Sequence, residues 1–138
     1  MIYKASLRAL TLLLLTAAAH GAEADLSQVP GVVVDHAPAS SGIYLGSAGI
    51  AVLPDGAYLA KCDEFGPKSS EHQQAATRVH RSDDRGKTWY SVARIDGLFW
   101  ANIFTHKGAV YLMGTKKHHG LIVIMRSDDG GQTWTEPA

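Results

Sequence analysis

The feature that most constrains the fold is an octapeptide that occurs twice in the chain. It starts at Ser82 and again at Ser127, 45 residues later, and both copies read Ser-x-Asp-x-Gly-x-Thr-Trp. Sequence similarity at a period of roughly 40–50 residues is typical of propeller blades and of other repeated units. The repeat therefore predicts an architecture of similar units placed side by side.

The residue types of the octapeptide predict a tight turn between two strands. Asp and Ser side chains can bond to backbone N–H groups, Gly can adopt a positive φ, and Trp supplies a large ring to bury. A calcium loop is the alternative, but it needs a distal bidentate Glu and more oxygen ligands. We therefore expect structural turns built by Ser82, Asp84, Gly86, Thr88 and Trp89, and by Ser127, Asp129, Gly131, Thr133 and Trp134.

Short β-prone runs separated by Gly-rich turns predict two antiparallel meanders. The expected strands are 49–53, 57–62, 77–81 and 88–95, then 100–105, 109–115 and 121–126, and a fourth strand barely begins before Ala138. Four short strands per repeat favour propeller blades over a sandwich, because radial repetition hides the sheet edges. The predicted units are a blade 1 at about 48–95 and an incomplete blade 2 at about 98–138.

Residues 1–24 have the pattern of a secretory signal peptide. Lys4 and Arg8 precede an apolar run over 9–19, and Ala22-Glu23-Ala24 is a small-x-small cleavage site. The run is shorter than the ~20 residues that span a bilayer, and no Cys follows it for lipidation. We expect residues 25–138 to be exported to the periplasm or the extracellular space, with no membrane anchor.

The composition limits the classes of binding partner that we expect. The 138 residues carry 13 basic and 13 acidic side chains, so the chain lacks the excess of basic residues that binding to nucleic acid requires.

Cys62 is the only cysteine, which excludes an intrachain disulfide, and its apolar strand pattern predicts a buried structural thiol. Neighbouring histidines such as His118 and His119 point to opposite faces of a strand, so we expect no metal and no cofactor.

The two octapeptides resemble the Asp-box, or bacterial neuraminidase repeat, of sialidases and related β-propellers. In that family the box lies on the turn between the two outer strands of a blade, away from the catalytic face. The resemblance implies an all-β, sialidase-like β-propeller, six-bladed in the full protein, of which this chain forms about two four-stranded antiparallel blades. With a leading strand at 32–35, we interpret the chain as the amino-terminal part of a longer protein.

The resemblance also places candidate site residues. Sialidases start the innermost strand of the first blade with Arg-Ile-Pro, and Gly46 stands here in the slot of the arginine. That arginine pairs bidentately with the carboxylate of sialic acid, a contact that glycine cannot make. The family's acid carboxylate falls at or beside Glu71, with Asp63 and Glu64 earlier on the same connection. The alternative for Glu71 is a solvated loop residue.

The second unit opens with a candidate sugar platform. In a propeller the start of an inner strand faces the central pocket, so Trp100 or Phe99 can stack on a sugar ring and Asn102 can bond its hydroxyls. The alternative is packing between blades. The tyrosine nucleophile of the family belongs to later blades.

These observations lead to one expected function and one rival. The expected function is an exported sialidase-like protein that acts on a glycan, of the exo-α-sialidase or glycoside hydrolase type, and that is inactive as this fragment. The rival is a non-catalytic Asp-box propeller that binds carbohydrate or protein.

Overall fold

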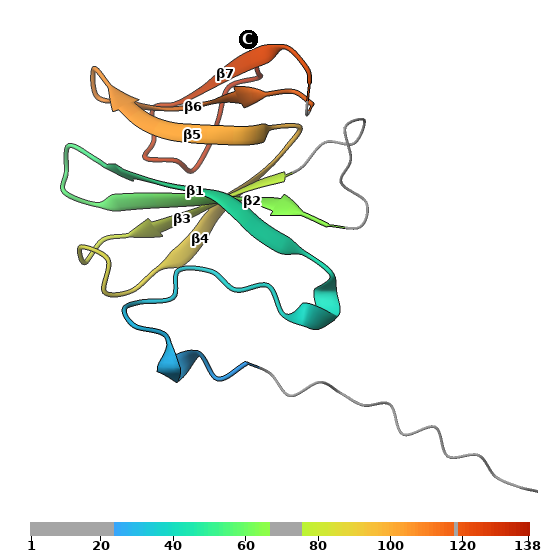
Figure 1. The fold of residues 1–138 in the computed structure, drawn as a ribbon. Coiled ribbons are helices and arrows are strands. Elements are labelled where there is room, and N and C mark those ends of the chain that lie inside the picture. Colours follow the sequence, from blue (N-terminus) through green and yellow to red (C-terminus); the bar gives the residue numbers. More distant parts are fainter. Residues whose placement is uncertain (1–23, 67–75, 118) are drawn as a thin grey trace, which may run out of the picture.

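The computed structural model describes residues 24–66, 76–117 and 119–138, and it is built from two antiparallel sheets that pack against each other (Figure 1). The first sheet contains β1 (Tyr44–Val52), β2 (Tyr58–Phe65), β3 (Ala76–Ser82) and β4 (Tyr90–Asp96), in chain order. The second contains β5 (Phe99–His106), β6 (Ala109–Thr115) and β7 (Ile122–Ser127). Two short 3-10 helices, η1 (Leu26–Gln28) and η2 (Ala39–Ser41), precede the sheets. The predicted all-β fold class is confirmed.

Three strand boundaries differ from the sequence prediction by more than one residue. β2 ends at Phe65 instead of residue 62, so Asp63 and Glu64 lie in a strand and not on the connection that follows it. β1 begins at Tyr44 instead of residue 49, because a register shift between Gly46 and Gly49, with Ser47 at φ 49°, lets the pairing continue through the glycines. β4 begins at Tyr90 instead of residue 88, because the last residues of the octapeptide still belong to the turn.

The second sheet has three strands, one fewer than a full blade. Residues 135–138 nevertheless run beside β7, since the N–H groups of Ile124 and Ala138 each donate to the carbonyl of the other at 3.0 Å. Thr135 N–H also donates to Arg126 O at 2.9 Å. The last residues therefore begin the pairing of a fourth strand, as the sequence predicts.

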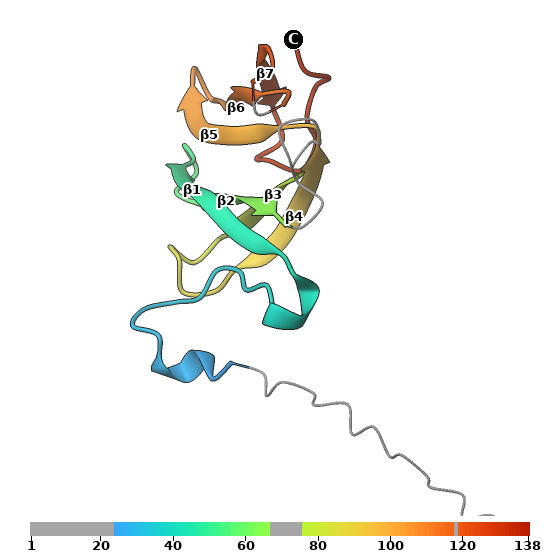
Figure 2. The same cartoon turned by 45° about the vertical axis from the view of Figure 1, so that its right-hand side comes forward.

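The segment 32–35, predicted as a leading strand whose partner lies in another blade, pairs with no strand among the described residues. The segment instead crosses the face of the first sheet that is turned away from the second sheet (Figure 2). There Val33 and Val34 line a cavity together with Leu45 and Ala60. Its β-branched residues favour extended backbone, but they pack against a sheet face and not along a strand edge.

One apolar core lies between the two sheets. Leu59, Val79 and Leu112 are fully buried in it, and the remaining members are Ala51, Leu53, Ala57, Ile95, Leu98, Ala101, Ile103, Val110, Val123 and Met125. Side chains alternate between the faces of a strand, so the buried residues of β2 are Leu59, Lys61 and Asp63. The two units are thus packed together through a shared interior.

A buried ion pair lies in the same layer as the core. Lys61 Nζ is 3.0 Å from Asp63 Oδ1, and both side chains have 0% exposure. Asp63 also accepts hydrogen bonds from Thr77 Oγ1 at 2.7 Å and from the N–H of Ala101 at 3.1 Å. Because Ala101 belongs to β5, this carboxylate connects the first sheet to the second.

No helix within the described residues is long and apolar enough to cross a membrane. The predicted signal peptide lies almost entirely outside the described residues, as do Glu71 and His118.

Candidate functional site

The two sheets have two distinct ends. β1 and β5 both start at one end, which we call the mouth, where Tyr44, Phe65, Asp96 and Phe99 lie. The opposite end, which we call the turn end, carries both octapeptides; in Figure 1 the mouth is on the right and the turn end on the left. The octapeptides are therefore remote from the starts of the inner strands.

The first octapeptide is closed by its own side chains. Asp84 Oδ1 accepts from the N–H groups of Lys87 and Thr88 at 3.0 and 2.8 Å, and Oδ2 accepts from Thr88 Oγ1 at 2.7 Å. Ser82 Oγ accepts from the N–H of Gly86 at 2.7 Å and donates to Asp84 Oδ1 at 2.8 Å. The bonds from Thr88 favour the ionised carboxylate and lower the pKa of Asp84 to about 2.

The second octapeptide repeats the arrangement. Asp129 accepts from the N–H and Oγ1 of Thr133, which lowers its pKa to about 2, and Trp134 Nε1 donates to Gly131 O at 3.0 Å. Gly131 has φ 92°, and a Cβ there would lie 2.9 Å from a Leu59 methyl group in the first sheet. In the described residues this carboxylate is engaged within its own turn, which leaves it little capacity for a ligand.

Three aromatic rings meet at the mouth. Phe65 and Phe99 meet edge to face with centroids 5.3 Å apart, and Phe99 and Trp100 are 5.2 Å apart. Phe99 is 4% exposed whereas Trp100 is 49% exposed, and Asn102 is exposed as well. A register shift between Phe99 and Asn102, with Trp100 at φ 50°, creates this difference. Of the two candidate platform residues, the geometry presents Trp100 to solvent and packs Phe99 inside.

Gly46, the position that the resemblance matches to the sialidase arginine, lies against the ring of Phe65. A Cβ on Gly46 would lie only 2.8 Å from Cε2 of the Phe65 ring. An arginine at this position would therefore require the ring to move. At this point the mouth is aromatic and carries no guanidinium.

The described carboxylates at or near the mouth are already paired, and Asp96 bonds Arg94. Asp63 is buried against Lys61, and Glu64 bonds Arg94 at 3.0 and 2.8 Å and also binds Arg78. The hydrogen bonds from Arg94 lower the pKa of Glu64, so this side chain is ionised at neutral pH and poorly suited to donate a proton. Glu71 lies outside the described residues, but the strands on either side of it end and begin at the mouth.

One cluster of side chains was not predicted from the sequence. Asp35, Cys62 and His80 come together on the face of the first sheet that is turned away from the second sheet. Cys62 is half-buried. Its burial and, to a smaller extent, the negative charge of Asp35 raise the pKa of the thiol to about 12. The strand register supplies only part of the signal: Ala60 pairs with His80, so Cys62 and His80 share one face of adjacent strands, but no local pattern places Asp35 beside them.

The fold has counterparts among solved structures of glycan-acting enzymes. A Hadza microbial sialidase matches with a TM-score of 0.57 and 19% identity, covering 76% of this chain and 27% of that chain. An α-L-arabinofuranosidase of Fusarium graminearum, in complex with arabinobiose, matches with a TM-score of 0.54 and 20% identity over 70% of this chain and 31% of that chain. Trypanosoma rangeli sialidase matches with a TM-score of 0.51 and 19% identity, covering 63% of this chain and 13% of that chain.

The chain thus spans less than a third of the length of each of these proteins. No protein-family model matches the sequence, and no curated protein matches it. At these identities the likeness shows the fold, and the chain has the fold of the sialidase-like β-propellers, as the repeated octapeptide predicts.

Proposed function

We propose that this chain contributes to an exported, sialidase-like propeller that acts on glycans, of the glycoside hydrolase type. The observation that carries the proposal is the aromatic mouth, where Trp100 is half exposed beside Phe99 and Phe65. Aromatic rings present a flat apolar face on which the C–H groups of a sugar ring can pack, and the amide of Asn102 can bond hydroxyl groups. The structural neighbours support a glycan as the ligand, since their structures hold sialic acid or arabinobiose.

The sugar we propose is neutral and not sialic acid. Sialic acid carries a carboxylate, which is best held by a bidentate arginine. Gly46, which the resemblance matches to that arginine, supplies no guanidinium and lies against the ring of Phe65. If the complete protein is a hydrolase, Glu71 is our candidate for the acid that protonates the leaving oxygen. The pattern over residues 1–24 supports export.

A second candidate function is a non-catalytic propeller that binds carbohydrate or protein. Asp63 and Glu64 both form ion pairs with basic side chains. Neither carboxylate is therefore available for proton transfer, which favours the binding propeller over the enzyme. The two candidates share the aromatic mouth and differ in whether a bond is cleaved.

The first test is binding. The chain is titrated with arabinobiose and with sialyllactose while backbone amide resonances are followed by NMR. We expect arabinobiose to perturb resonances at the mouth, and Trp100→Ala to abolish the effect. Tyr90→Ala is the matched control, because Tyr90 is 48% exposed but lies at the turn end. Binding that survives Trp100→Ala, or a preference for sialyllactose, would contradict the proposal.

The second test separates the enzyme from the binding module. The chain is incubated with fluorogenic sialoside and arabinofuranoside, and we expect no release from the sialoside. Turnover that is abolished by Glu71→Gln would establish catalysis. Sugar binding without turnover of either substrate, in a protein that carries all its blades, would establish the binding module.

A further inference from the structure

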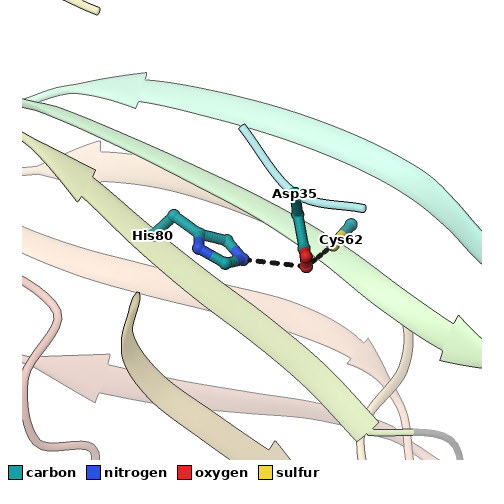
Figure 3. Close-up of side chains that lie close together, drawn as sticks. All are labelled: Asp35, Cys62 and His80. Atoms are coloured by element: carbon teal, nitrogen blue, oxygen red, sulfur yellow. Dashed lines mark hydrogen bonds and ion pairs between the residues drawn. The ribbon is translucent and has the colours of Figure 1, made fainter. Parts of the chain in front are cut away.

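Three side chains of different chemistry meet on the face of the first sheet that is turned away from the second sheet (Figure 3). Asp35 comes from the segment that crosses this face, Cys62 from β2 and His80 from β3. Asp35 Oδ2 lies 3.0 Å from His80 Nε2 and 3.5 Å from Cys62 Sγ. All three ligand atoms lie within 4.8 Å of one another, and the side chains of His80 and Asp35 are only 10% and 14% exposed.

The order of the three groups argues against a nucleophilic site. A cysteine nucleophile needs the imidazole next to the thiol, with the carboxylate behind the imidazole. Here the carboxylate lies between the two, bonded to both (Figure 3). The geometry instead resembles a set of ligands that point at a common centre.

We propose that Asp35, Cys62 and His80 bind a divalent zinc-type metal ion. Thiolate, imidazole and carboxylate are the three ligand types that zinc uses in proteins. Bonds of ~2.0–2.3 Å place the ligand atoms of a tetrahedral zinc about 3–4 Å apart, which is close to the spacings seen here. The ion would therefore fit after small side-chain rotations, without movement of the strands.

Three protein ligands leave the fourth position of a tetrahedral ion open. The cluster borders a cavity of about 340 Å³ that is also lined by Val33, Val34, Leu45, Gly46, Ala48 and Ala60. The fourth ligand would accordingly be a water molecule or a small molecule that enters this mainly apolar space. A metal here also fastens the segment of Asp35 to the sheet, because the other two ligands belong to β2 and β3.

The charges around the cluster are compatible with a cation. The guanidinium of Arg78 contacts both oxygens of Asp35 at 3.2 Å, but it is shared with Glu64, which also binds Arg94. Arg78 can thus hold the carboxylate in place as an outer-sphere partner. The nearby Lys61 Nζ is bound to Asp63 on the opposite face. Binding displaces the proton of Cys62 to solvent, so the thiolate and Asp35 together match the double charge of the ion.

The test uses the full chain stripped with a chelator and then titrated with Co²⁺ and Zn²⁺. We expect one equivalent of Co²⁺ to give a thiolate-to-cobalt charge-transfer band and the visible bands of a tetrahedral ion. Cys62→Ser should remove the charge-transfer band, and Asp35→Asn and His80→Gln should each weaken binding at least tenfold. His106→Ala is the control, because His106 is exposed on β5 in the second sheet.

A second measurement needs no variant and so does not depend on the folding of one. Zn²⁺ should protect Cys62 of the wild-type chain from alkylation, and a chelator should reverse the protection. The proposal is overturned if the metal gives no protection and no charge-transfer band. It is equally overturned if the band survives in both Asp35→Asn and His80→Gln with unchanged affinity, since the thiol alone would then account for it.

Discussion

Replacing Asp63 by Ala should destabilise the chain more than any other single carboxylate replacement among the described residues. The substitution leaves Lys61 buried without its counter-ion, although its side chain has 0% exposure. It also removes the acceptor of the Thr77 hydroxyl and of the Ala101 N–H. Removal of one partner from a buried ion pair costs about 3–5 kcal/mol.

The double substitution Lys61→Met/Asp63→Ala tests the cause of that loss. It removes the unpaired charge and fills the space with an apolar side chain, which is often neutral for stability. The Ala101 N–H stays unpaired, so a cost of about 1–3 kcal/mol should remain. The double variant should therefore be more stable than Asp63→Ala alone, although it carries one more substitution.

Urea denaturation followed by tryptophan fluorescence measures both variants. Asp128→Ala is the control, since Asp128 pairs with Arg126 at the surface, and surface pairs contribute little. The reasoning is refuted if Asp63→Ala costs less than about 1 kcal/mol, the lower bound for an unpaired buried donor. It is also refuted if the double variant is no more stable than the single one.

Two further predictions concern the turn end and the mouth. The pKa of Asp84 and of Asp129 is about 2 in the folded chain and 3.8 in the unfolded chain, so the stability they confer is complete above pH 3.8 and lost as the pH falls to about 2. The free energy of unfolding should therefore fall less steeply with decreasing pH in Asp84→Asn/Asp129→Asn than in the wild type, and an unchanged slope would contradict this. Gly46→Ala should lower the free energy of unfolding, measured by urea denaturation, by about 1–3 kcal/mol, because the new methyl group presses on the Phe65 ring. The same substitution should cost less in a Phe65→Leu background, and costs that simply add would contradict the contact.

The strands and turns could be predicted because their signals are local. The octapeptide specifies its own hydrogen bonds within four residues, and alternation along each strand gives the sheet faces. The start of β1 was missed because Gly46 and Gly49 indicate a break, and only the pairing with β2 shows that the chain passes through a bulge. Sequence patterns do not contain that tertiary contact.

The candidate sites also differ in how far the sequence predicts them. Trp100 could be proposed from its place at the start of an inner strand, but its exposure depends on the bulge that follows Phe99. The cluster of Asp35, Cys62 and His80 could not be proposed, because Asp35 lies 27 residues from Cys62 and 45 from His80. It forms because an extended segment crosses a sheet face, and residue spacing carries no record of that crossing.

The closure of the octapeptides has a consequence for the order of folding. The carboxylate and hydroxyl bonds of each turn join residues no more than four apart, so each turn can close before any strand pairing is complete. Contacts of short sequence separation cost little loop entropy and form early. The glycine of the second turn, in contrast, rests on Leu59 of the first sheet, a contact between distant parts of the chain. We expect substitutions in the first turn to slow refolding, and substitutions at Gly131 to accelerate unfolding instead.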